Sequence, residues 1–236
     1  MIKSVILFSG IAGLLAAQST PANNFLVHNL VSDLPGIADH QDARLKNPWG
    51  NGFGATPFWV GDNGSGVSTL YDGTGTALTI VVTIPEAGGK GSSGPVTGVI
   101  FNAFASNTSA FQVAPGKAPS FIFCSEDGVI SGWNTTVDAS NAKVLVDNSK
   151  NNAVYKGCAL GGTSAAPLIF AANFNSGKVD VIDAGLNVNA GAFTSAFADP
   201  AIPAGFAPFN VAVIGGNVLV SYAKQDGQKE DDVAGA

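Results

Sequence analysis

The sequence has little charge. Asp, Glu, Lys and Arg make up 12% of its 236 residues, about half of the roughly 25% found in an average globular chain. The 11 Lys and Arg against 17 Asp and Glu give a net charge of −6, which argues against a nucleic-acid binder because such proteins need a basic surface patch. Low charge together with 3 Trp, 3 Tyr and 15 Phe also excludes an intrinsically disordered chain, which is poor in apolar groups and high in net charge.

Histidine and cysteine are scarce, with 2 of each. The sequence has no H-E-x-x-H motif, EF-hand loop or Cys-rich metal spacing, so we expect no metal site and no cofactor. Cys124 and Cys158 both lie in apolar strand patterns. Export would permit a disulfide between them, but a buried free cysteine also behaves as a small hydrophobic residue. We favour two reduced, buried cysteines and leave a Cys124–Cys158 disulfide as the alternative.

Long hydrophobic runs are missing except at the N-terminus. There Lys3 precedes the apolar run Val5–Leu15, and small residues follow that run. The run is too short to span a bilayer, which takes about 20 residues, whereas this order of features is typical of a secretory signal peptide. We predict a signal peptide over residues 1–19, cleaved between residues 16 and 20. The mature chain is then secreted, extracellular or periplasmic, and has no membrane contact.

Turn-forming residues are plentiful, with 30 Gly and 12 Pro, and few helix formers accompany them. This composition predicts an all-β protein with many tight turns. A pattern of two apolar runs joined by an Asn-, Asp- and Gly-rich turn recurs four times, and it predicts β-hairpins because these residues tolerate positive φ. The paired runs are Phe58–Gly66 with Val67–Gly73, Phe121–Gly128 with Val129–Asn134, Leu168–Gly177 with Lys178–Asp183, and Asn217–Tyr222 before a turn at Gln225–Gly227.

Each hairpin is preceded by a further short strand, and a fourth strand follows it, most clearly at Ala77–Ile84. Four antiparallel strands at a period near 50 residues are typical of a β-propeller blade. A β-sandwich also has short strands and regular turns, and it is the alternative. We predict an all-β propeller of about four blades over residues 20–228, with the last blade incomplete. The predicted first strands are Trp49–Phe53, Thr97–Phe101, Lys156–Leu160 and Phe209–Ile214.

The two ends of this repeat array are less regular. Phe25–Leu30 has the pattern of an N-terminal strand that would complete a last blade. We expect this strand to lack its proper partner, the residues after Tyr222 to be disordered, and residues 229–236 to form a frayed charged tail. Closure with four blades is the alternative, because four blades is the lower limit of the architecture. A closed propeller would be a monomer.

Four stretches of the sequence resemble a known family. They are Asn29–Gly36, Asn47–Gly50, Gly66–Gly73 and Glu126–Asn134. The family consists of secreted, functionally uncharacterised proteins, mostly bacterial, that are similar to NHL-type six-bladed propellers, and the resemblance covers essentially the whole mature chain. Its members continue for about two more blades. The resemblance therefore implies an NHL-like fold without an agreed activity, and a C-terminally truncated chain that is less stable than one with further blades.

Two short motifs resemble a cofactor-binding and a catalytic sequence pattern, but both are better explained as loops. Gly89–Gly94 matches G-x-G-x-x-G, yet a strand pattern follows it where dinucleotide binding needs a helix N-terminus. Gly162–Pro167 resembles the nucleophile segment of subtilases, a chemistry that also needs a base histidine and an orienting carboxylate. Neither His28 nor His40 has that sequence context.

Asp39, His40 and Asp42 are the catalytic candidates, within the long segment from Asp33 to Lys46. Histidine acts as a base or a ligand near neutral pH, flanking carboxylates raise its pKa, and long loops are often functional. The alternative is a solvated connection to the first blade. Trp49 and Trp133 are the binding candidates because indole rings stack on sugars or peptides, although aromatics in strands more often pack between blades.

These observations predict a secreted binding or scaffold module that holds a protein or a glycan on one propeller face. The alternative is a propeller lyase or hydrolase with a polar or metal cluster in the central funnel. Two histidines in one N-terminal segment are poor material for such an enzyme, so we favour binding. Three or more carboxylates or histidines pointing at the axis would favour the enzyme, since the fold alone sets no chemistry.

Overall fold

The computed structural model describes residues 25–54, 57–89, 91, 93–189, 197 and 199–234. The predicted signal peptide, residues 1–19, lies outside the described residues. Within the described part, the regular elements are strands and two short 3₁₀ turns, η1 (Ala87–Gly89) and η2 (Ser149–Asn151). No helix there is long and apolar enough to cross a membrane. The expected all-β class is confirmed.

The strands from β3 to β15 form antiparallel sheets in chain order, as expected for propeller blades. Blades 1 and 2 have four strands each, whereas three described strands form blade 3 and two form blade 4. Blade 1 is β3 (Pro48–Phe53), β4 (Phe58–Asp62), β5 (Val67–Tyr71) and β6 (Ala77–Thr83); blade 2 is β7 (Val96–Phe101), β8 (Phe121–Ser125), β9 (Val129–Trp133) and β10 (Lys143–Asp147); blade 3 is β11 (Tyr155–Thr163), β12 (Ala166–Asn173) and β13 (Lys178–Ile182); blade 4 is β14 (Phe206–Ile214) and β15 (Asn217–Lys224).

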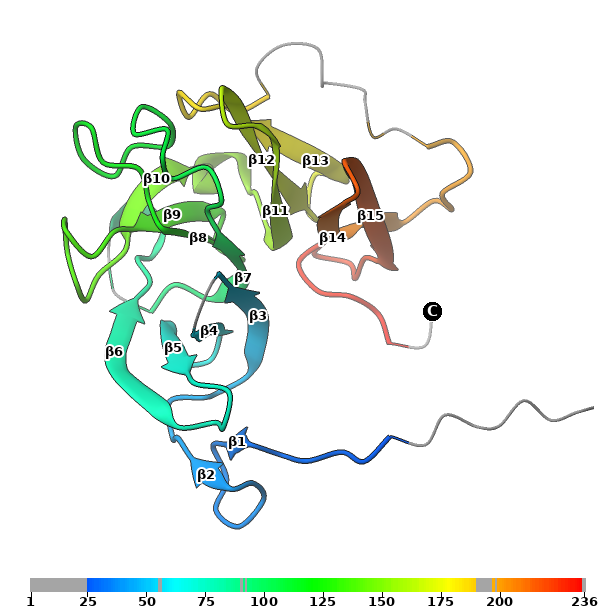
Figure 1. The fold of residues 1–236 in the computed structure, drawn as a ribbon. Coiled ribbons are helices and arrows are strands. Elements are labelled where there is room, and N and C mark those ends of the chain that lie inside the picture. Colours follow the sequence, from blue (N-terminus) through cyan, green and yellow to red (C-terminus); the bar gives the residue numbers. More distant parts are fainter. Residues whose placement is uncertain are drawn as a thin grey trace, which may run out of the picture.

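The four blades stand around a common axis, with the inner strands β3, β7, β11 and β14 next to one another. Figure 1 shows them as an arc whose open side lies between blade 4 and the short strands β1 (Val31–Ser32) and β2 (His40–Gln41). The chain therefore forms a partial β-propeller. Three predicted hairpins and all four predicted first strands are present. In the fourth repeat, among the described residues, the turn after β15 is followed by a single bridge between Gln225 and Asp232, and β15 pairs with β14.

The core lies between neighbouring blades. Trp59 of blade 1 stacks on Phe121 of blade 2 with ring centroids 4.0 Å apart. Ile122 and Ile169 are buried together between blades 2 and 3, and Phe170 packs with Val211 between blades 3 and 4. Each blade therefore buries one apolar face against the next, and the alternating apolar pattern of the strands specifies this packing.

Glycines with positive φ close the hairpins. Gly128 between β8 and β9 has φ +81°, and a Cβ there would lie 2.7 Å from the carbonyl oxygen of Ala153. In the first hairpin the left-handed residue is Gly66, with φ +66°. An L-residue with a side chain would strain either position, which explains the turn signal in the sequence.

The prediction that the N-terminal strand covers Phe25–Leu30 is wrong. The structure assigns no strand to Phe25–Leu30, and pairing begins at β1, which runs parallel to β2. The carbonyl oxygens of Asn29 and Leu30 already accept hydrogen bonds from the backbone of Asp39 and His40. Local pairing with this segment therefore replaces pairing with a blade.

The expectation of disorder after Tyr222 is also wrong. The strand β15 continues to Lys224, and a turn follows in which the Asp226 N–H donates to the Asp231 carbonyl oxygen at 2.8 Å. The Val233 N–H then donates to the Lys224 carbonyl oxygen at 2.9 Å. In place of a frayed tail, residues 225–234 fold back because their backbone groups find partners.

Cys124 and Cys158 form a disulfide, contrary to the favoured expectation that both are reduced. Cys124 lies in β8 of blade 2 and Cys158 in β11 of blade 3, with Cα atoms 6.5 Å apart, within the usual range for a disulfide. Gly98 of β7 makes room for it, because a Cβ there would lie 2.4 Å from the Cys124 sulfur. The sequence showed two apolar strands but not that neighbouring blades bring them face to face.

Candidate functional site

Each inner strand contains a β-bulge at the same place. In β3, Pro48 pairs with Asp62 and Gly50 with Gly61, so one residue between them has no partner on the neighbouring strand. The same register shift occurs in β7, β11 and β14. A bulge bends the strand and redirects the side chain of the extra residue. The extra residues are Trp49, Thr97, Lys156 and Phe209, and we call them the axial ring.

The side chains of the axial ring adjoin one another across the blades. The rings of Trp49 and Phe209 are 6.0 Å apart between centroids, although they belong to the first and fourth blades. The Lys156 ammonium lies 5.3 Å from the centroid of Trp49. Thr97 donates its hydroxyl to the carbonyl oxygen of Tyr155 at 2.6 Å. Trp49, Phe209 and Lys156 thus build one mixed aromatic and charged cluster, and Thr97 binds the backbone of the residue before Lys156.

Lys156 is the buried cation of this cluster. Its side chain is 1% exposed and forms ion pairs with Glu126 and, at 3.1 Å, with Asp231. The ring of Phe174 lies 5.9 Å from the ammonium. An ammonium leaves water at a large cost unless it is paired and hydrogen-bonded. Two carboxylates and two aromatic rings meet that requirement here.

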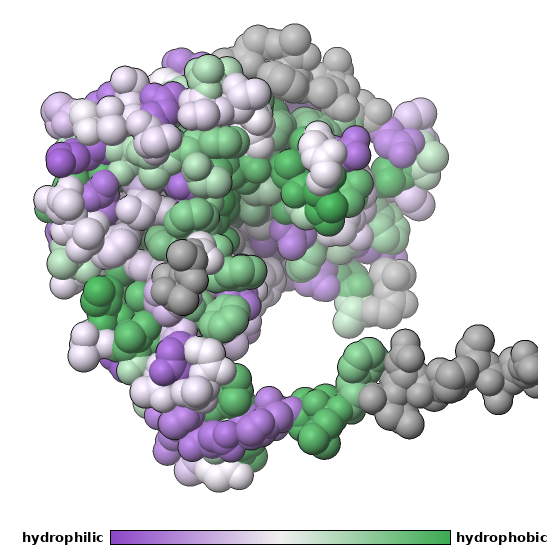
Figure 2. Space-filling view, viewed as in Figure 1, coloured by the Kyte–Doolittle hydropathy of each residue, from purple (hydrophilic) through white to green (hydrophobic). Residues whose placement is uncertain are grey.

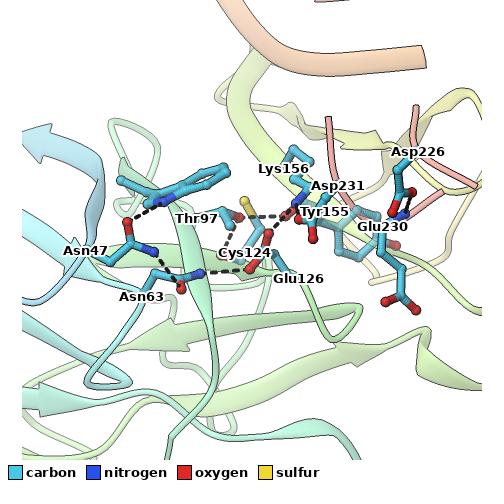
Figure 3. A network of polar contacts seen from close by, with 11 residues as sticks. Asn47, Asn63, Thr97, Cys124, Glu126, Tyr155, Lys156, Asp226, Glu230 and Asp231 are labelled. Carbon is cyan, nitrogen blue, oxygen red and sulfur yellow. Dashed lines mark hydrogen bonds and ion pairs between the residues drawn. The ribbon is translucent and has the colours of Figure 1, made fainter. Parts of the chain in front are cut away.

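A chain of polar contacts connects Lys156 to Trp49 through two amides (Figure 3). The Trp49 Nε1–H donates to Asn47 Oδ1 at 3.1 Å, Asn47 Nδ2 donates to Asn63 Oδ1 at 3.2 Å, and Asn63 Nδ2 donates to Glu126 Oε2 at 2.9 Å. Figure 3 shows Asn47, Asn63, Glu126, Lys156 and Asp231 following one another from blade 1 to the C-terminal turn. The indole ring and the carboxylates are therefore held in fixed positions.

A pocket of about 350 Å³ opens beside Lys156. It is lined by Glu126, Asp127, Val154, Glu230 and Asp231, so its walls are acidic. The turn at residues 225–234 forms one wall, and the Asp231 side chain is 78% exposed. We call this pocket, together with Trp49, the mouth.

The predicted catalytic candidates do not belong to the mouth. The Asp39 carboxylate lies 2.8 Å from His28 Nε2. His40 is exposed in β2, whereas Asp42 is buried and paired with Arg44. Figure 1 places β2 on the far side of the open part of the arc from blade 4. Three neighbours in sequence thus have three different surroundings, and no shared chemical centre is formed among them.

Asp42 anchors the N-terminal segment to blade 1. Its two oxygens accept hydrogen bonds from the Arg44 side chain at 2.9 and 3.0 Å, and Tyr71 donates its hydroxyl at 3.1 Å. Burial raises the pKa of Asp42, but the hydrogen bonds from Arg44 and Tyr71 outweigh it and leave the pKa below its usual value. This ionised carboxylate has a structural role.

Asp62 is a second buried carboxyl group near Asp42. It is fully buried at the end of β4, and burial raises its pKa to about 7 despite a 2.7 Å hydrogen bond from Thr69. Among the residues that the structure describes, none gives Oδ1 a hydrogen-bond partner. Burial therefore moves the pKa of Asp62 from the usual carboxyl range toward neutral pH.

The two predicted binding tryptophans have different surroundings. Trp133 is buried and lies 4.9 Å from Trp59 between ring centroids, so it belongs to the core and is unsuited to binding. Trp49 is 37% exposed at the mouth. A separate exposed pair, Phe53 and Phe58, has ring centroids 5.7 Å apart at the other end of β3.

Sequence reasoning missed most of the mouth. Lys156, Glu126 and Asp231 were not among the candidates, and neither were Asn47 and Asn63. A signal was present in the dipeptides that end in glycine at equivalent places in three inner strands, which are Trp49-Gly50, Thr97-Gly98 and Lys156-Gly157. The glycine lets the neighbouring backbone approach, and the residue before it enters the axial ring.

No family model matches the chain. Two uncharacterized proteins of Acanthamoeba polyphaga mimivirus are similar to it, 28% and 26% identical over 206 residues. The match covers 85% of this chain and 49% and 52% of those proteins, so the chain spans about half the length of these relatives. The relatives are uncharacterised as expected, but they are viral and not bacterial.

A solved structure, described as a streptogramin B lyase structure, is similar in fold. The TM-score is 0.51 at 9% sequence identity, and the match covers 78% of this chain and 53% of that one. At this identity the similarity concerns the fold and not the chemistry. It agrees with the partial propeller described above.

Proposed function

We propose that the chain is an exported, NHL-like β-propeller module that binds a glycan at the mouth. The observation that carries the proposal is Trp49, a half-exposed indole that donates to Asn47 and lies next to Lys156, and that a chain of amides connects to an acidic pocket. Export is supported by the predicted leader and by the Cys124–Cys158 disulfide, because disulfides persist in oxidising compartments.

The mouth suits an uncharged, hydroxyl-rich ligand. Each sugar hydroxyl both donates and accepts a hydrogen bond, and carboxylates and amides such as Glu126 and Asn63 supply matching groups. The apolar face of a sugar ring packs on an exposed aromatic ring. Four carboxylates against one lysine make the pocket unfavourable for anions. A small number of fixed polar groups around an apolar platform is the usual form of a small-ligand site.

Binding is favoured over catalysis because Lys156 and three of the four carboxylates that line the pocket are already paired. Lys156 is buried and neutralised by Glu126 and Asp231, and Asp127 accepts hydrogen bonds from Ser125 and from the Ala87 N–H. Groups that are paired and immobile orient a ligand without reorganising. A base or nucleophile would need one of these contacts to break first.

The proposal is tested by titrating the purified chain with a panel of neutral oligosaccharides in a calorimeter. Trp49→Ala is expected to weaken the binding at least tenfold. Phe58→Ala, an exposed aromatic at the other end of blade 1, is the matched control and should bind normally. Equal affinity for both variants, or no binding by the parent chain, would overturn the proposal. In the second case the exposed Phe53–Phe58 pair becomes the leading surface for a protein partner.

An acid–base enzyme is the second candidate. The observation in its favour is that four carboxylates line one pocket next to Lys156. A lyase or hydrolase should produce new chain ends from an oligosaccharide that binds. Such products should disappear in Glu126→Gln while calorimetric binding remains, and their absence from the parent chain would reject the enzyme.

A further inference from the structure

The disulfide between Cys124 and Cys158 lies next to the ion pair of the mouth. Cys124 comes two residues before Glu126. Cys158 comes two residues after Lys156 in β11. Two residues of extended chain span about 7 Å, so the disulfide and the ion pair join the same two segments of blades 2 and 3. Figure 3 shows Cys124 close to the contacts made by Thr97 and Glu126.

The disulfide is the strongest connection between these two segments. The strands β8 and β11 belong to different sheets, so their backbones do not pair. The Thr97 hydroxyl lies between them, 3.2 Å from the carbonyl oxygen of Cys124 and 2.6 Å from that of Tyr155. A hydroxyl has one hydrogen to donate, so this bridge is weaker than the covalent bond beside it.

Glu126 cannot follow Lys156 if the two segments separate. Its N–H donates to the Pro95 carbonyl oxygen at 3.0 Å, and its carboxylate accepts a hydrogen bond from Asn63 at 2.9 Å. These contacts hold it to blades 1 and 2, whereas Lys156 belongs to blade 3. Without Glu126, the only carboxylate left on the ammonium is Asp231, whose side chain is 78% exposed. A buried ammonium that loses its partner is destabilised, so the lysine side chain then moves toward water.

We infer that the Cys124–Cys158 disulfide regulates the mouth, because only the oxidised chain holds Lys156 against Glu126 and keeps the pocket in its fixed form. Disulfides form in oxidising compartments, so the chain becomes competent to bind there. The regulation of ligand binding rests on the proposed function. The effect of the disulfide on Lys156 does not.

The chemical step is a thiol–disulfide exchange with a dithiol. Cys158 is partly exposed, whereas Cys124 is fully buried, and Figure 2 shows hydrophilic residues bordering the open centre of the arc. A thiolate of the dithiol attacks the Cys158 sulfur, and Cys124 leaves as a thiolate that takes up a proton. The second thiolate then displaces Cys158. The two cysteines gain two electrons and two protons, and the dithiol becomes a cyclic disulfide. A small-molecule disulfide reverses the step and is itself reduced to thiols.

Amine labelling tests the effect on Lys156 without any ligand. The full chain is reduced with dithiothreitol, freed of it under argon and treated with an acetylating N-hydroxysuccinimide ester. We expect acetylation of Lys156, followed on its peptide by mass spectrometry, to become at least tenfold faster than in the oxidised chain. Cys124→Ala/Cys158→Ala should behave like the reduced chain. Lys150 is exposed and serves as the internal control, with the same rate in every sample.

Ile182→Ala separates loss of the disulfide from loss of stability. Ile182 is buried between blades 2 and 3, at the end of β13 away from the hairpin turn, and its truncation destabilises a core to an extent comparable with loss of a disulfide. This variant should keep Lys156 protected. Equal Lys156 reactivity in the oxidised and reduced chains, or the same rise in Ile182→Ala, would overturn the inference. So would a reduced chain that circular dichroism shows to be unfolded, because the effect is then not confined to the mouth.

Calorimetry with the same panel of neutral oligosaccharides tests the regulation itself. We expect affinity to fall at least tenfold on reduction and to return after reoxidation with glutathione disulfide, while Ile182→Ala binds like the parent chain. Unchanged affinity in the reduced chain would overturn the regulation. If Lys156 becomes reactive on reduction but the oxidised parent chain binds no oligosaccharide, the proposed function fails and the control of the mouth by the disulfide stands.

Discussion

At the residue scale, the most informative groups are the buried ionisable ones, Lys156 and Asp62. Both are out of contact with water, but only Lys156 has full charge compensation, from Glu126 and Asp231. Asp62 has one hydrogen bond and an unpartnered oxygen. Lys156 therefore stabilises the folded chain only while both carboxylates pair with it. The raised pKa of Asp62 makes the free energy of unfolding depend on pH.

Stability should fall as the pH rises through the range set by Asp62. Its folded pKa of about 7 lies above its unfolded value of 3.8, so between these values the folded chain holds a proton that the unfolded chain has released. The free energy of unfolding is then expected to drop by up to about 4 kcal/mol between pH 4 and pH 7 and to level off above that. Asp62→Asn should remove this slope in urea titrations at pH 5 and pH 8. An equally steep slope in the variant would contradict the assignment.

Removing the buried ammonium should be costly. Lys156→Met leaves Glu126 without its cation partner in a partly buried site, and breaking such a pair costs about 3–5 kcal/mol of unfolding free energy. Lys150→Met, at an exposed lysine, is the control and should stay within about 0.5 kcal/mol of the parent chain. Chemical denaturation measures both changes. A small loss at position 156 would show that water reaches the site.

At the element scale, the hairpins are the predictable part of this fold and the contacts between them are not. Alternation and turn residues were enough to place β4 with β5 and β8 with β9, because these signals are local. The disulfide and the mouth depend on how one blade meets the next. The bulges at Trp49 and Lys156 have almost no local signal, since one extra residue in a strand leaves the alternation nearly intact.

The disulfide joins β8 to β11 and should stabilise the contact between blades 2 and 3. It closes a loop with a sequence separation of 34 residues, and the chain-entropy estimate for such a loop is about 4 kcal/mol. Cys124→Ala/Cys158→Ala is expected to lose about that much unfolding free energy. The parent chain under strong reductant should match the double variant. If the oxidised and reduced chains unfold at the same denaturant concentration, the disulfide has no stabilising effect.

The blades should also differ in local stability. Both strands of the central hairpin in blade 2, β8 and β9, are buried at every residue, whereas β15 alternates between exposed and half-buried positions. Amide hydrogen exchange is expected to be slowest in β8 and β9 and fastest in β15, because edge strands open locally at low cost. Equal protection in blades 2 and 4 would mean that the sheet array unfolds as one unit.

At the scale of the whole molecule, the chain is an arc of blades whose stability comes from neighbouring contacts. In such arrays each unit is stabilised by its neighbours, and here apolar side chains are buried between blades 1 and 2, blades 2 and 3, and blades 3 and 4. The sequence period predicted the blades, whereas the predictions of a strand over Phe25–Leu30 and of disorder after Tyr222 were wrong. It did not predict that the last residues fold back onto Lys156, because an ion pair between Asp231 and a lysine 75 residues away has no local signature.

Export also belongs to this scale and stays a prediction. The chain expressed in a secreting host should appear in the exported fraction with a new N-terminus between residues 16 and 20, because the pattern of Lys3 and Val5–Leu15 is that of a cleaved leader. Intact-mass spectrometry of the exported protein measures this directly. A product that retains Met1 would contradict it.

The repeated bulge has a consequence for how such molecules diverge. The bulged residue is left out of the ladder between the inner strand and its neighbour, so its identity is decoupled from the pairing that builds the blade. The four positions already hold an indole, a hydroxyl, an ammonium and a phenyl ring on the same backbone plan. Related chains can therefore change the chemistry around the axis without altering strand pairing, provided that a buried group such as Lys156 is replaced together with its ion-pair partners.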